Sequence, residues 1–326
     1  MKRFDVRVLV TGAAGFIGAA VSQALLDRGD DVIGLDSVNA YYSRDLKRYR
    51  LAKLSTHARF EFHTQDLSEV VPALALVANI RPDIIIHLAA QAGVRASAEV
   101  PFDYVRSNLI GHMTMLEAAR ALPNLQQLVY ASSSSVYGNR ADGLFCETDR
   151  VDEPTSLYAA TKRADELMTG VYCGSYDLPA TGLRFFTVYG PAGRPDMAYW
   201  IFAEQIMAGK PITLYDGGAL KRDFTYVDDI VSGILAVADN PPHKGQHRIY
   251  NIGNNNPETV LALVSALEAA LGMSAIVHTA PKPSYDVTMT AANIDAMIRD
   301  FNWRPTTSLF DGIQKFGDWF KTWNRQ

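Results

Sequence analysis

The chain has 326 residues, 48% of them hydrophobic and 20% charged, and a formal net charge of −4 at pH 7. This length suits two domains, or one domain with a large lobe, and the scattered lysines and arginines argue against a nucleic-acid partner. Two cysteines, Cys146 and Cys173, are too few for a disulfide framework, and no run reaches the roughly 20 apolar residues of a membrane helix. We expect a cytoplasmic globular protein without membrane partners.

A glycine-rich turn, Gly12-Ala13-Ala14-Gly15-Phe16-Ile17-Gly18, follows the first predicted strand and opens a helical pattern. Gly12 permits a sharp bend, Gly15 lets backbone approach a phosphate, and Gly18 allows close packing of the helix on the strand. This context predicts that N–H groups at the helix N-terminus bind a dinucleotide pyrophosphate. The residues expected to hold it are Gly12, Gly15, Phe16, Ile17 and Gly18.

Asp36 ends the second predicted strand, residues 31–35, about 20 residues beyond the turn. A carboxylate there can accept hydrogen bonds from the ribose hydroxyls of NAD and would repel the 2′-phosphate of NADP, so NAD is the expected cofactor. A solvated aspartate at a strand end is the alternative. Asp66 and Leu67, after a third apolar run at 59–63, would then flank the adenine.

A serine run, Ser132-Ser133-Ser134-Ser135, comes at the end of a predicted strand, residues 128–133. Ligands of doubly wound sheets bind beyond such strand ends, so the Ser133 hydroxyl can bond a substrate oxygen. Downstream, Tyr158 and Lys162 share a helix face, and the ammonium can lower the pKa of the phenol so that it acts as a base. Tyr49 and Lys53 have the same spacing without serines upstream, and they serve as an internal decoy.

Predicted strands at 6–10, 31–35, 59–63, 84–88, 128–133 and 180–186 alternate with helical stretches. This alternation predicts an α/β fold, a Rossmann-type doubly wound parallel sheet covered on both faces. After Gly190 proline and glycine become frequent, and short strands mix with helices around 200–208, 227–237, 259–271 and 309–322. We interpret this part as a smaller mixed α/β substrate lobe.

Over essentially its whole length the chain resembles extended short-chain dehydrogenase/reductases of the nucleotide-sugar epimerase and dehydratase group, and within it UDP-glucuronate 4-epimerases. The general resemblance rests on residues 11–18, His87-Leu88-Ala89-Ala90, 132–138 and 158–162. The closer one rests on residues 36–50, Gln91-Ala92-Gly93-Val94-Arg95, Arg184-Phe185-Phe186-Thr187-Val188-Tyr189-Gly190-Pro191 and Gly193-Arg194-Pro195-Asp196-Met197-Ala198.

The resemblance implies an NAD-binding Rossmann domain of residues 1–187 plus about 226–252, and a nucleotide-sugar-binding lobe of residues 188–225 plus about 253–326. A cleft between them would hold a UDP-sugar, and two helices of the large domain would form a homodimer. Ala89, Ala131, Tyr158 and Lys162 complete the expected NAD-binding set. Asn108 would support the active site. The histidines show no ligand spacing, so no metal is expected.

The implied reaction is reversible 4-epimerisation of UDP-glucuronate to UDP-galacturonate through a 4-keto intermediate with tightly bound NAD. Tyr158 would be the base, assisted by Lys162 and Ser133. The intermediate is a β-keto acid, and by resemblance short hydroxyls, with Arg194 nearby, hold its carboxylate away from the alignment that loses carbon dioxide. The expected substrate-binding residues are Ser134, Ser135, Thr187, Arg194, Arg222, Arg95 and Lys282.

Several alternatives stay open at this point. Thr187 could instead cap the end of an apolar strand. Residues 282–287 lack the Gly-Asp-Val stretch of many relatives, which leaves the outer UDP contacts, Lys282 included, undecided. A UDP-glucose 4-epimerase or a UDP-glucuronate decarboxylase would share the fold and cofactor. A 4,6-dehydratase needs an acid pair at the positions of Ser134 and Ser135, so the serines argue against that activity. A non-catalytic NAD-sensing protein commonly lacks the catalytic base, so the presence of Tyr158 argues against that class.

Overall fold

The computed structural model describes residues 6–140, 143–282 and 287–324. Contacts divide the chain into two compact units. Unit 1 comprises Met1–Val136, Val151–Arg184 and Val231–Tyr250, and unit 2 comprises Tyr137–Arg150, Phe185–Ile230 and Asn251–Gln326. Within the described ranges, no helix has the length and apolar character required to cross a bilayer.

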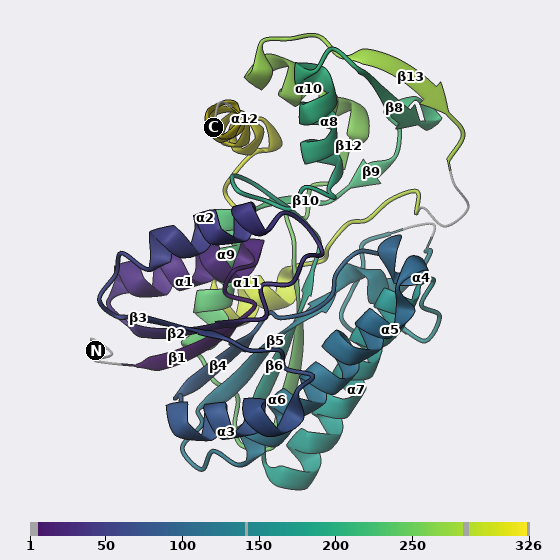
Figure 1. Cartoon of the computed structure of the whole chain (residues 1–326). Coiled ribbons are helices and arrows are strands. Elements are labelled where there is room, and N and C mark those ends of the chain that lie inside the picture. The colour runs from purple at the N-terminus through teal and green to yellow at the C-terminus, as the bar shows by residue number, and fades with distance from the viewer. Residues whose placement is uncertain (1–5, 141–142, 283–286, 325–326) are drawn as a thin grey trace. The chain divides into compact units, whose positions relative to one another are not determined.

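A seven-stranded sheet forms the centre of unit 1 (Figure 1). Its strands are β1 (Arg7–Thr11), β2 (Asp31–Asp36), β3 (Phe60–Thr64), β4 (Ile84–His87), β5 (Gln127–Ser133), β6 (Ala180–Phe185) and β11 (His247–Ile252). Their order is β11-β6-β5-β4-β1-β2-β3, and β1 pairs in parallel with both β2 and β4. This is the doubly wound sheet that the alternation of strands and helices predicts.

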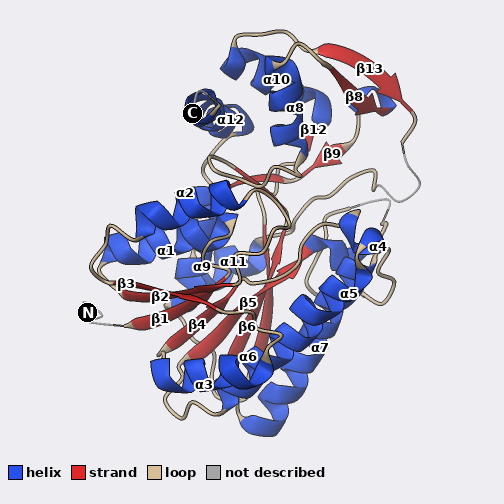
Figure 2. Ribbon diagram, in the orientation of Figure 1, coloured by secondary structure: helices blue, strands red, loops and turns tan. Residues whose placement is uncertain are grey.

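Helices cover both faces of this sheet (Figure 2). One face carries α1 (Phe16–Arg28), α2 (Arg44–Leu54) and α9 (Val227–Ala238), and the other carries α3 (Val70–Ile80), α6 (Gly111–Arg120) and α7 (Leu157–Tyr176). Because both faces are covered, β4 can be almost wholly apolar, with Ile84, Ile85 and Ile86 fully buried. Ile85, Met115 and Leu128 belong to the core between the sheet and α3 and α6.

The helical stretch between β4 and β5 has an irregular first half. It consists of the short helices α4 (Ala96–Glu99) and α5 (Pro101–Tyr104), a π-helical turn (Val105–Ile110) and then α6. Single π turns inside helices occur frequently at functional sites. This one carries Asn108, whose buried side chain reaches into the candidate site.

The strand order reverses between β1 and β4, which makes the carboxyl ends of these strands the expected ligand-binding edge of the sheet. Thr11 ends β1 and His87 ends β4, and Thr11 Oγ1 lies 2.7 Å from His87 Nδ1. Burial lowers the pKa of His87 to about 3, so its ring is neutral at pH 7. The polar groups at this edge are therefore fixed to one another without adding charge.

Unit 2 mixes helices with two-stranded sheets, as expected for the smaller lobe. The helices are α8 (Ala198–Met207), α10 (Val260–Leu271), α11 (Asp295–Phe301) and α12 (Leu309–Trp323). The paired strands are β7 (Thr187–Tyr189) with β10 (Phe224–Tyr226), β8 (Pro211–Tyr215) with β13 (Ile276–Ala280), and β9 (Lys221–Arg222) with β12 (Glu258–Thr259). An aromatic cluster joins α8 to α12 through Tyr199, Trp200, Phe316 and Phe320.

The segment Tyr137–Arg150 belongs to unit 2, whereas the predicted division assigned it to the larger domain. The Tyr137 hydroxyl donates to Asn251 Oδ1 at 2.6 Å, and Asn251 Nδ2 donates to the Phe145 carbonyl at 2.7 Å. Phe145 N also donates to the Ala291 carbonyl at 2.8 Å. These partners are more than 100 residues apart in sequence, so local patterning gives no sign of them.

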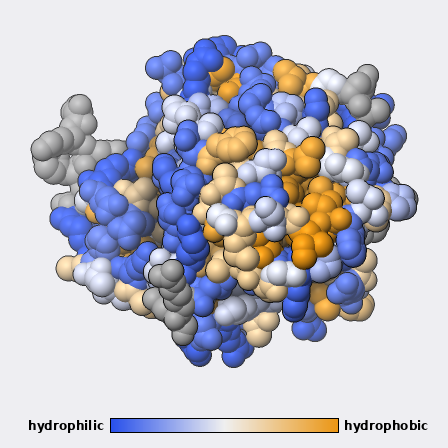
Figure 3. Space-filling model, turned by 90° about the horizontal axis from the view of Figure 1, so that it is seen from above, coloured by the Kyte–Doolittle hydropathy of each residue, from blue (hydrophilic) through white to orange (hydrophobic). Residues whose placement is uncertain are grey.

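Most large apolar side chains are buried, but some lie at the surface. Figure 3 shows apolar side chains gathered in one area of a face that is otherwise largely hydrophilic. In unit 1 the exposed residues include Phe102 on α5 and Leu167 and Val171 on α7, with exposed fractions of 76%, 56% and 63%. Leu167 and Val171 are four residues apart and therefore share one face of α7.

Candidate active site

The glycine turn between β1 and α1 is too closely packed for side chains. A Cβ on Gly12 would lie 2.8 Å from Ala89 N, and a Cβ on Gly18 would lie 2.0 Å from the Gly12 carbonyl oxygen. Gly12 also has a φ of +73°. No side chain caps α1, whose N-cap is Gly15, so the helix begins with backbone N–H groups that suit an anionic ligand. These residues fit the pyrophosphate of a dinucleotide.

Asp36 is fixed beside this turn. Its Oδ2 accepts from Ala14 N at 3.1 Å, its Oδ1 accepts from Val38 N at 2.7 Å, and Lys47 Nζ lies 3.8 Å from Oδ1. Its side chain is only 9% exposed, which contradicts the alternative of a solvated aspartate. Burial lowers the pKa of Lys47, and Asp36 partly offsets this. Lys47 was missed as a site residue, although the resemblance to epimerases already included it.

The other expected cofactor residues of unit 1 lie near the carboxyl ends of its strands. Asp66 follows β3, and its Oδ1 accepts from the Ser68 backbone N at 2.8 Å. Leu67 is buried, and Ala89, after β4, donates its N–H to Thr11 Oγ1 at 3.2 Å. Ala131 lies within β5. Arg95, expected to bind substrate, comes directly before α4.

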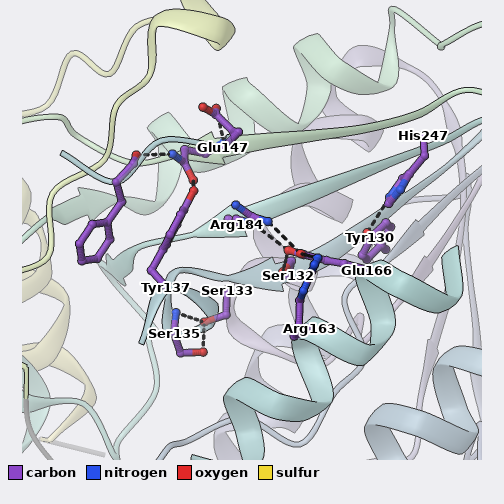
Figure 4. A network of polar contacts seen from close by, with 12 residues as sticks. Tyr130, Ser132, Ser133, Ser135, Tyr137, Glu147, Arg163, Glu166, Arg184 and His247 are labelled. Carbon is purple, nitrogen blue, oxygen red and sulfur yellow. Dashed lines mark hydrogen bonds and ion pairs between the residues drawn. The ribbon is translucent and has the colours of Figure 1, made fainter. Parts of the chain in front are cut away.

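The serine run forms an ordered turn rather than a mobile loop. Ser133 is the last residue of β5, and Ser134 and Ser135 begin the 3₁₀ turn Ser134–Tyr137. Ser135 donates to Ser133 Oγ twice, from its backbone N at 3.2 Å and from its hydroxyl at 2.9 Å (Figure 4). The hydroxyls of Ser133 and Ser135 are thus held side by side at the end of the strand.

A buried polar network joins the end of β5 to α7 (Figure 4). Ser132 Oγ donates to Glu166 Oε1 at 2.6 Å, and Arg184 donates to both Glu166 oxygens at 2.8 and 2.9 Å. Burial would raise the pKa of Glu166, but its hydrogen bonds and ion pair with Arg184, helped by Ser132 and Arg163, hold it below the ordinary value. The strand that carries Ser133 is therefore locked to the helix that carries Tyr158 and Lys162.

Tyr158 and Lys162 lie in the first two turns of α7, which Ser156 caps by accepting from Ala159 N. The Tyr158 ring packs edge-on against Tyr104, with centroids 6.2 Å apart. Lys162 is buried, and its ammonium pairs with Asp165 Oδ2 at 3.1 Å. Asp165 was missed, although an acid three residues after a lysine is a common ion-pair spacing on a helix.

Asn108 links this part of α7 to the loop after β4. Its Oδ1 accepts from Gln91 N at 2.8 Å, and its Nδ2 donates to the Gln91 carbonyl at 3.1 Å and to Thr161 Oγ1 at 2.9 Å. Thr161 directly precedes Lys162. Asn108 therefore holds the backbone beside the lysine, in keeping with its expected supporting place.

The decoy pair Tyr49 and Lys53 lies on α2, with the Lys53 ammonium 4.6 Å from the centroid of the Tyr49 ring.

Thr187 opens β7 instead of ending the preceding strand, and its N–H donates to the Asp223 carbonyl at 3.0 Å. The buried Asp223 carboxylate accepts from the backbone N–H groups of Asn254, Asn255 and Ala292 at 2.6, 3.0 and 2.9 Å. Burial raises the pKa of Asp223, although these hydrogen bonds oppose the shift. Asp223 thereby fixes the backbone next to Arg222.

The basic residues expected to bind substrate have partners within unit 2. Arg194 Nε donates to Asp196 Oδ1 at 3.0 Å, and Arg222 Nη1 donates to the Lys221 carbonyl at 2.8 Å. The backbone N of Lys282 donates to Asp216 Oδ1 at 3.1 Å. Residues 283–286, part of the stretch that departs from relatives, lie outside the described residues. No set of three or more metal-ligating side chains comes together in the ranges that the structure describes.

Comparison with known proteins gives consistent matches. The NAD dependent epimerase/dehydratase family matches residues 8–253. UDP-glucuronate 4-epimerase 1 of Arabidopsis thaliana is 46% identical over 97% of this chain and 76% of its own length. Protein CapI of Staphylococcus aureus is 43% identical over 97% of this chain and 98% of its own. The crystal structure of UDP-glucuronic acid 4-epimerase from Bacillus cereus with UDP-glucuronic acid and NAD superposes with a TM-score of 0.90, at 33% identity over 98% and 100% of the chains.

Proposed function

The chain belongs to the NAD dependent epimerase/dehydratase family, and we propose that it interconverts UDP-glucuronate and UDP-galacturonate by inverting carbon 4, with NAD retained between turnovers. The observation that carries this is the likeness to UDP-glucuronate 4-epimerases over nearly the whole chain, in sequence and in fold. Unit 1 supports it with a cofactor turn, a base candidate and a hydroxyl cluster on adjoining elements.

Tyr158 is the proposed base that takes the proton from the 4-hydroxyl, and Ser133 is the proposed hydrogen-bond partner of the same oxygen. Lys162 supplies the positive charge that favours the phenolate. NAD would supply the hydride acceptor for carbon 4 and, once reduced, the hydride donor, so that inversion follows when the keto sugar presents its other face. The network of Ser132, Glu166 and Arg184 keeps the strand of Ser133 fixed against α7, so both hydroxyls are preorganised.

The cofactor would be held along the carboxyl edge of the unit 1 sheet. Asp36 is the proposed partner of the ribose hydroxyls and the reason for choosing NAD over NADP, because a fixed carboxylate repels a 2′-phosphate. The proposed NAD-binding residues are Gly12, Gly15, Phe16, Ile17, Gly18, Asp36, Asp66, Leu67, Ala89, Ala131, Tyr158 and Lys162.

The uronate carboxylate needs hydrogen-bond donors that fix its orientation without neutralising its charge. A β-keto acid whose carboxylate rotates freely loses carbon dioxide. In unit 1, Ser134 and Ser135 are proposed for this, since the 3₁₀ turn holds them directly after Ser133. Neutral hydroxyls donate one hydrogen bond each and leave the carboxylate ionised. The proposed substrate residues elsewhere are Arg95 in unit 1 and Thr187, Arg194, Arg222 and Lys282 in unit 2.

A homodimer that forms through unit 1 helices is the proposed assembly. It is supported by the exposed Phe102, Leu167 and Val171, which would bury apolar surface in such an interface. A reducing compartment, the cytoplasm, is the proposed location, supported by two cysteines without a disulfide, Cys146 and Cys173.

Proton NMR of the purified protein with UDP-glucuronate and no added cofactor tests the proposal. We expect UDP-galacturonate to accumulate until equilibrium. Formation of a UDP-pentose with carbon dioxide would assign a decarboxylase instead. Absence of turnover with UDP-glucuronate, but epimerisation of UDP-glucose, would assign a UDP-glucose 4-epimerase. No reaction with either would favour a non-catalytic NAD-binding protein.

A further inference from the structure

Asp165, the buried ion-pair partner of Lys162, has no part in the mechanism described above. Lys162 Nζ lies 3.1 Å from Asp165 Oδ2, and the two side chains are 4% and 0% exposed. The other carboxylate oxygen, Oδ1, is buried and makes no hydrogen bond among the described residues. The ammonium of Lys162 is therefore the charged group that compensates this carboxylate.

The titratable groups around Lys162 and Asp165 carry no charge that would compete with this ion pair. On β4 and α6, burial lowers the pKa of His87 to about 3 and that of His112 well below its ordinary value. On β5, burial raises the pKa of Tyr130 well above its ordinary value. On β11, burial lowers the pKa of His247 to about 4. These four side chains are therefore uncharged at pH 7.

One further carboxylate of α7 lies near the pair, and it has its own cation. Glu166 is bonded to both Arg184 nitrogens that face it, at 2.8 and 2.9 Å, and to Arg163 at 3.1 Å. Its charge is thus matched on the side of β5 and β6. Asp165 is left as the anion that acts on Lys162, the residue that in turn acts on the proposed base.

We propose that Asp165 is a positioning residue: it is the fixed counter-ion of Lys162, holds the ammonium in place, and sets the pH range in which the site is active. This rests on the proposed epimerase function. The carboxylate acts only through Lys162 and makes no contact with the substrate. Its negative charge partly offsets the effect of the ammonium on the phenol.

The sign of the effect on a pH profile follows from charge alone. A negative charge disfavours the loss of a proton from any group near it, so removing the charge favours proton loss throughout the site. The acid limb and the alkaline limb of the activity profile should then move in the same direction. Replacing the carboxylate by a neutral amide should shift the whole profile toward lower pH.

The protonation of Asp165 itself limits the pH range in which this shift can be measured. Burial raises the pKa of Asp165 to about 6, although Lys162 opposes this. The carboxylate is therefore mostly ionised at pH 7 and is neutralised as the pH falls below about 6. The wild-type protein and a variant without the charge should differ above that pH and converge below it.

The test is the pH dependence of kcat for UDP-glucuronate epimerisation between pH 5 and 10, in the NAD-loaded wild type and in Asp165→Asn. We expect the variant's profile to lie about one pH unit toward acid of the wild-type profile above pH 6, and the two to converge at lower pH. The matched control is Asp45→Asn, which removes an exposed acid paired with Arg48, three residues away on α2, and should leave the profile in place. An Asp165→Asn profile that is lower but not displaced would overturn the proposal.

A second variant separates charge from shape. Asp165→Ser also removes the charge but makes the side chain smaller, and it should give the same displacement. Different displacements for the two variants, or failure of both to fold, would assign Asp165 to packing and refute the inference. If the wild-type protein does not epimerise UDP-glucuronate, the proposed function fails first, and this is visible before any variant is made.

Discussion

A tyrosine with a lysine four residues later occurs twice in this chain, as Tyr158 with Lys162 on α7 and as Tyr49 with Lys53 on α2. The surroundings distinguish the two pairs. Lys162 is buried and ion-paired to Asp165, beside a strand that ends in Ser133. Lys53 is exposed and lies over the ring of its own tyrosine. At the scale of single residues, burial and neighbours decide which pair can do chemistry.

Tyr158→Phe removes the proposed base and leaves the ring in place. We expect turnover of UDP-glucuronate to fall by about 10²–10⁴-fold, the usual effect of losing a general base, while NAD remains bound. Coupled NMR and cofactor analysis of the same sample measure both quantities. Tyr49→Phe is the control and should be fully active. Normal turnover in Tyr158→Phe would remove Tyr158 from the mechanism.

Thr187→Ala tests the hold on the uronate carboxylate. Thr187 opens β7, and its main chain is secured by Asp223, so the strand should survive loss of the hydroxyl. We expect a larger fraction of UDP-pentose among the products, because the β-keto acid gains rotational freedom. The ratio of UDP-pentose to UDP-galacturonate by NMR measures this. Thr213→Ala, at an exposed position of β8, should give the wild-type ratio; the same ratio in Thr187→Ala would contradict the assignment.

At the scale of elements, the turn between β1 and α1 shows how tightly the helix start is packed. A methyl group on Gly18 would meet the Gly12 carbonyl oxygen at 2.0 Å, and a methyl group on Gly12 would meet backbone of the segment after β4. These neighbours are backbone atoms, so they cannot rotate away. Close packing of α1 on β1 thus depends directly on two glycines and brings the N–H groups of the helix to the carboxyl edge of the sheet.

Gly18→Ala should therefore destabilise unit 1 by about 1–3 kcal/mol, the usual cost of overpacking, and should reduce the NAD content of the purified protein. Thermal unfolding and the absorbance of released cofactor are the measurements. Gly174→Ala is the matched control on α7, where a Cβ would meet nothing within 4 Å. That change should stabilise the helix by about 0.5–1 kcal/mol, so equal effects of the two variants would refute the packing argument.

For the whole molecule, exposed apolar residues on α5 and α7 suggest where a second copy would bind. Val171 is 63% exposed and shares a helix face with Leu167. An exposed apolar surface of this kind commonly marks a site where a protein partner binds. The proposed dimer is therefore an expectation about the assembly rather than about the fold of one chain.

Val171→Glu places a charge on that helix face and should convert the dimer to a monomer of 35.9 kDa. Light scattering coupled to size-exclusion chromatography measures the mass. Val71→Glu, on α3 with 78% exposure, adds the same charge elsewhere on unit 1 and should leave the dimer intact. A wild-type protein that is monomeric at micromolar concentration would exclude the proposed interface.

Local sequence patterns predicted six of the seven strands of the large sheet to within a residue or two, the glycine turn, and the strand ends that carry Asp36 and Ser133, but they did not predict β11. These features depend on hydrophobic periodicity, turn chemistry and spacing along one stretch of chain, which sequence displays directly. The family resemblance added the substrate class and the reaction. No such pattern predicted the π-helical turn that presents Asn108.

The sequence by itself thus determined the doubly wound sheet and the candidate residues along it. Only the tertiary structure placed Tyr137–Arg150 in unit 2, because Asn251 and Ala291 bind it from distant parts of the chain. Only the tertiary structure buried Asp165 with Lys162 and locked Glu166 to Arg184. The strength of a charge depends on burial and on partners brought together by folding, and neither can be read from spacing along the chain.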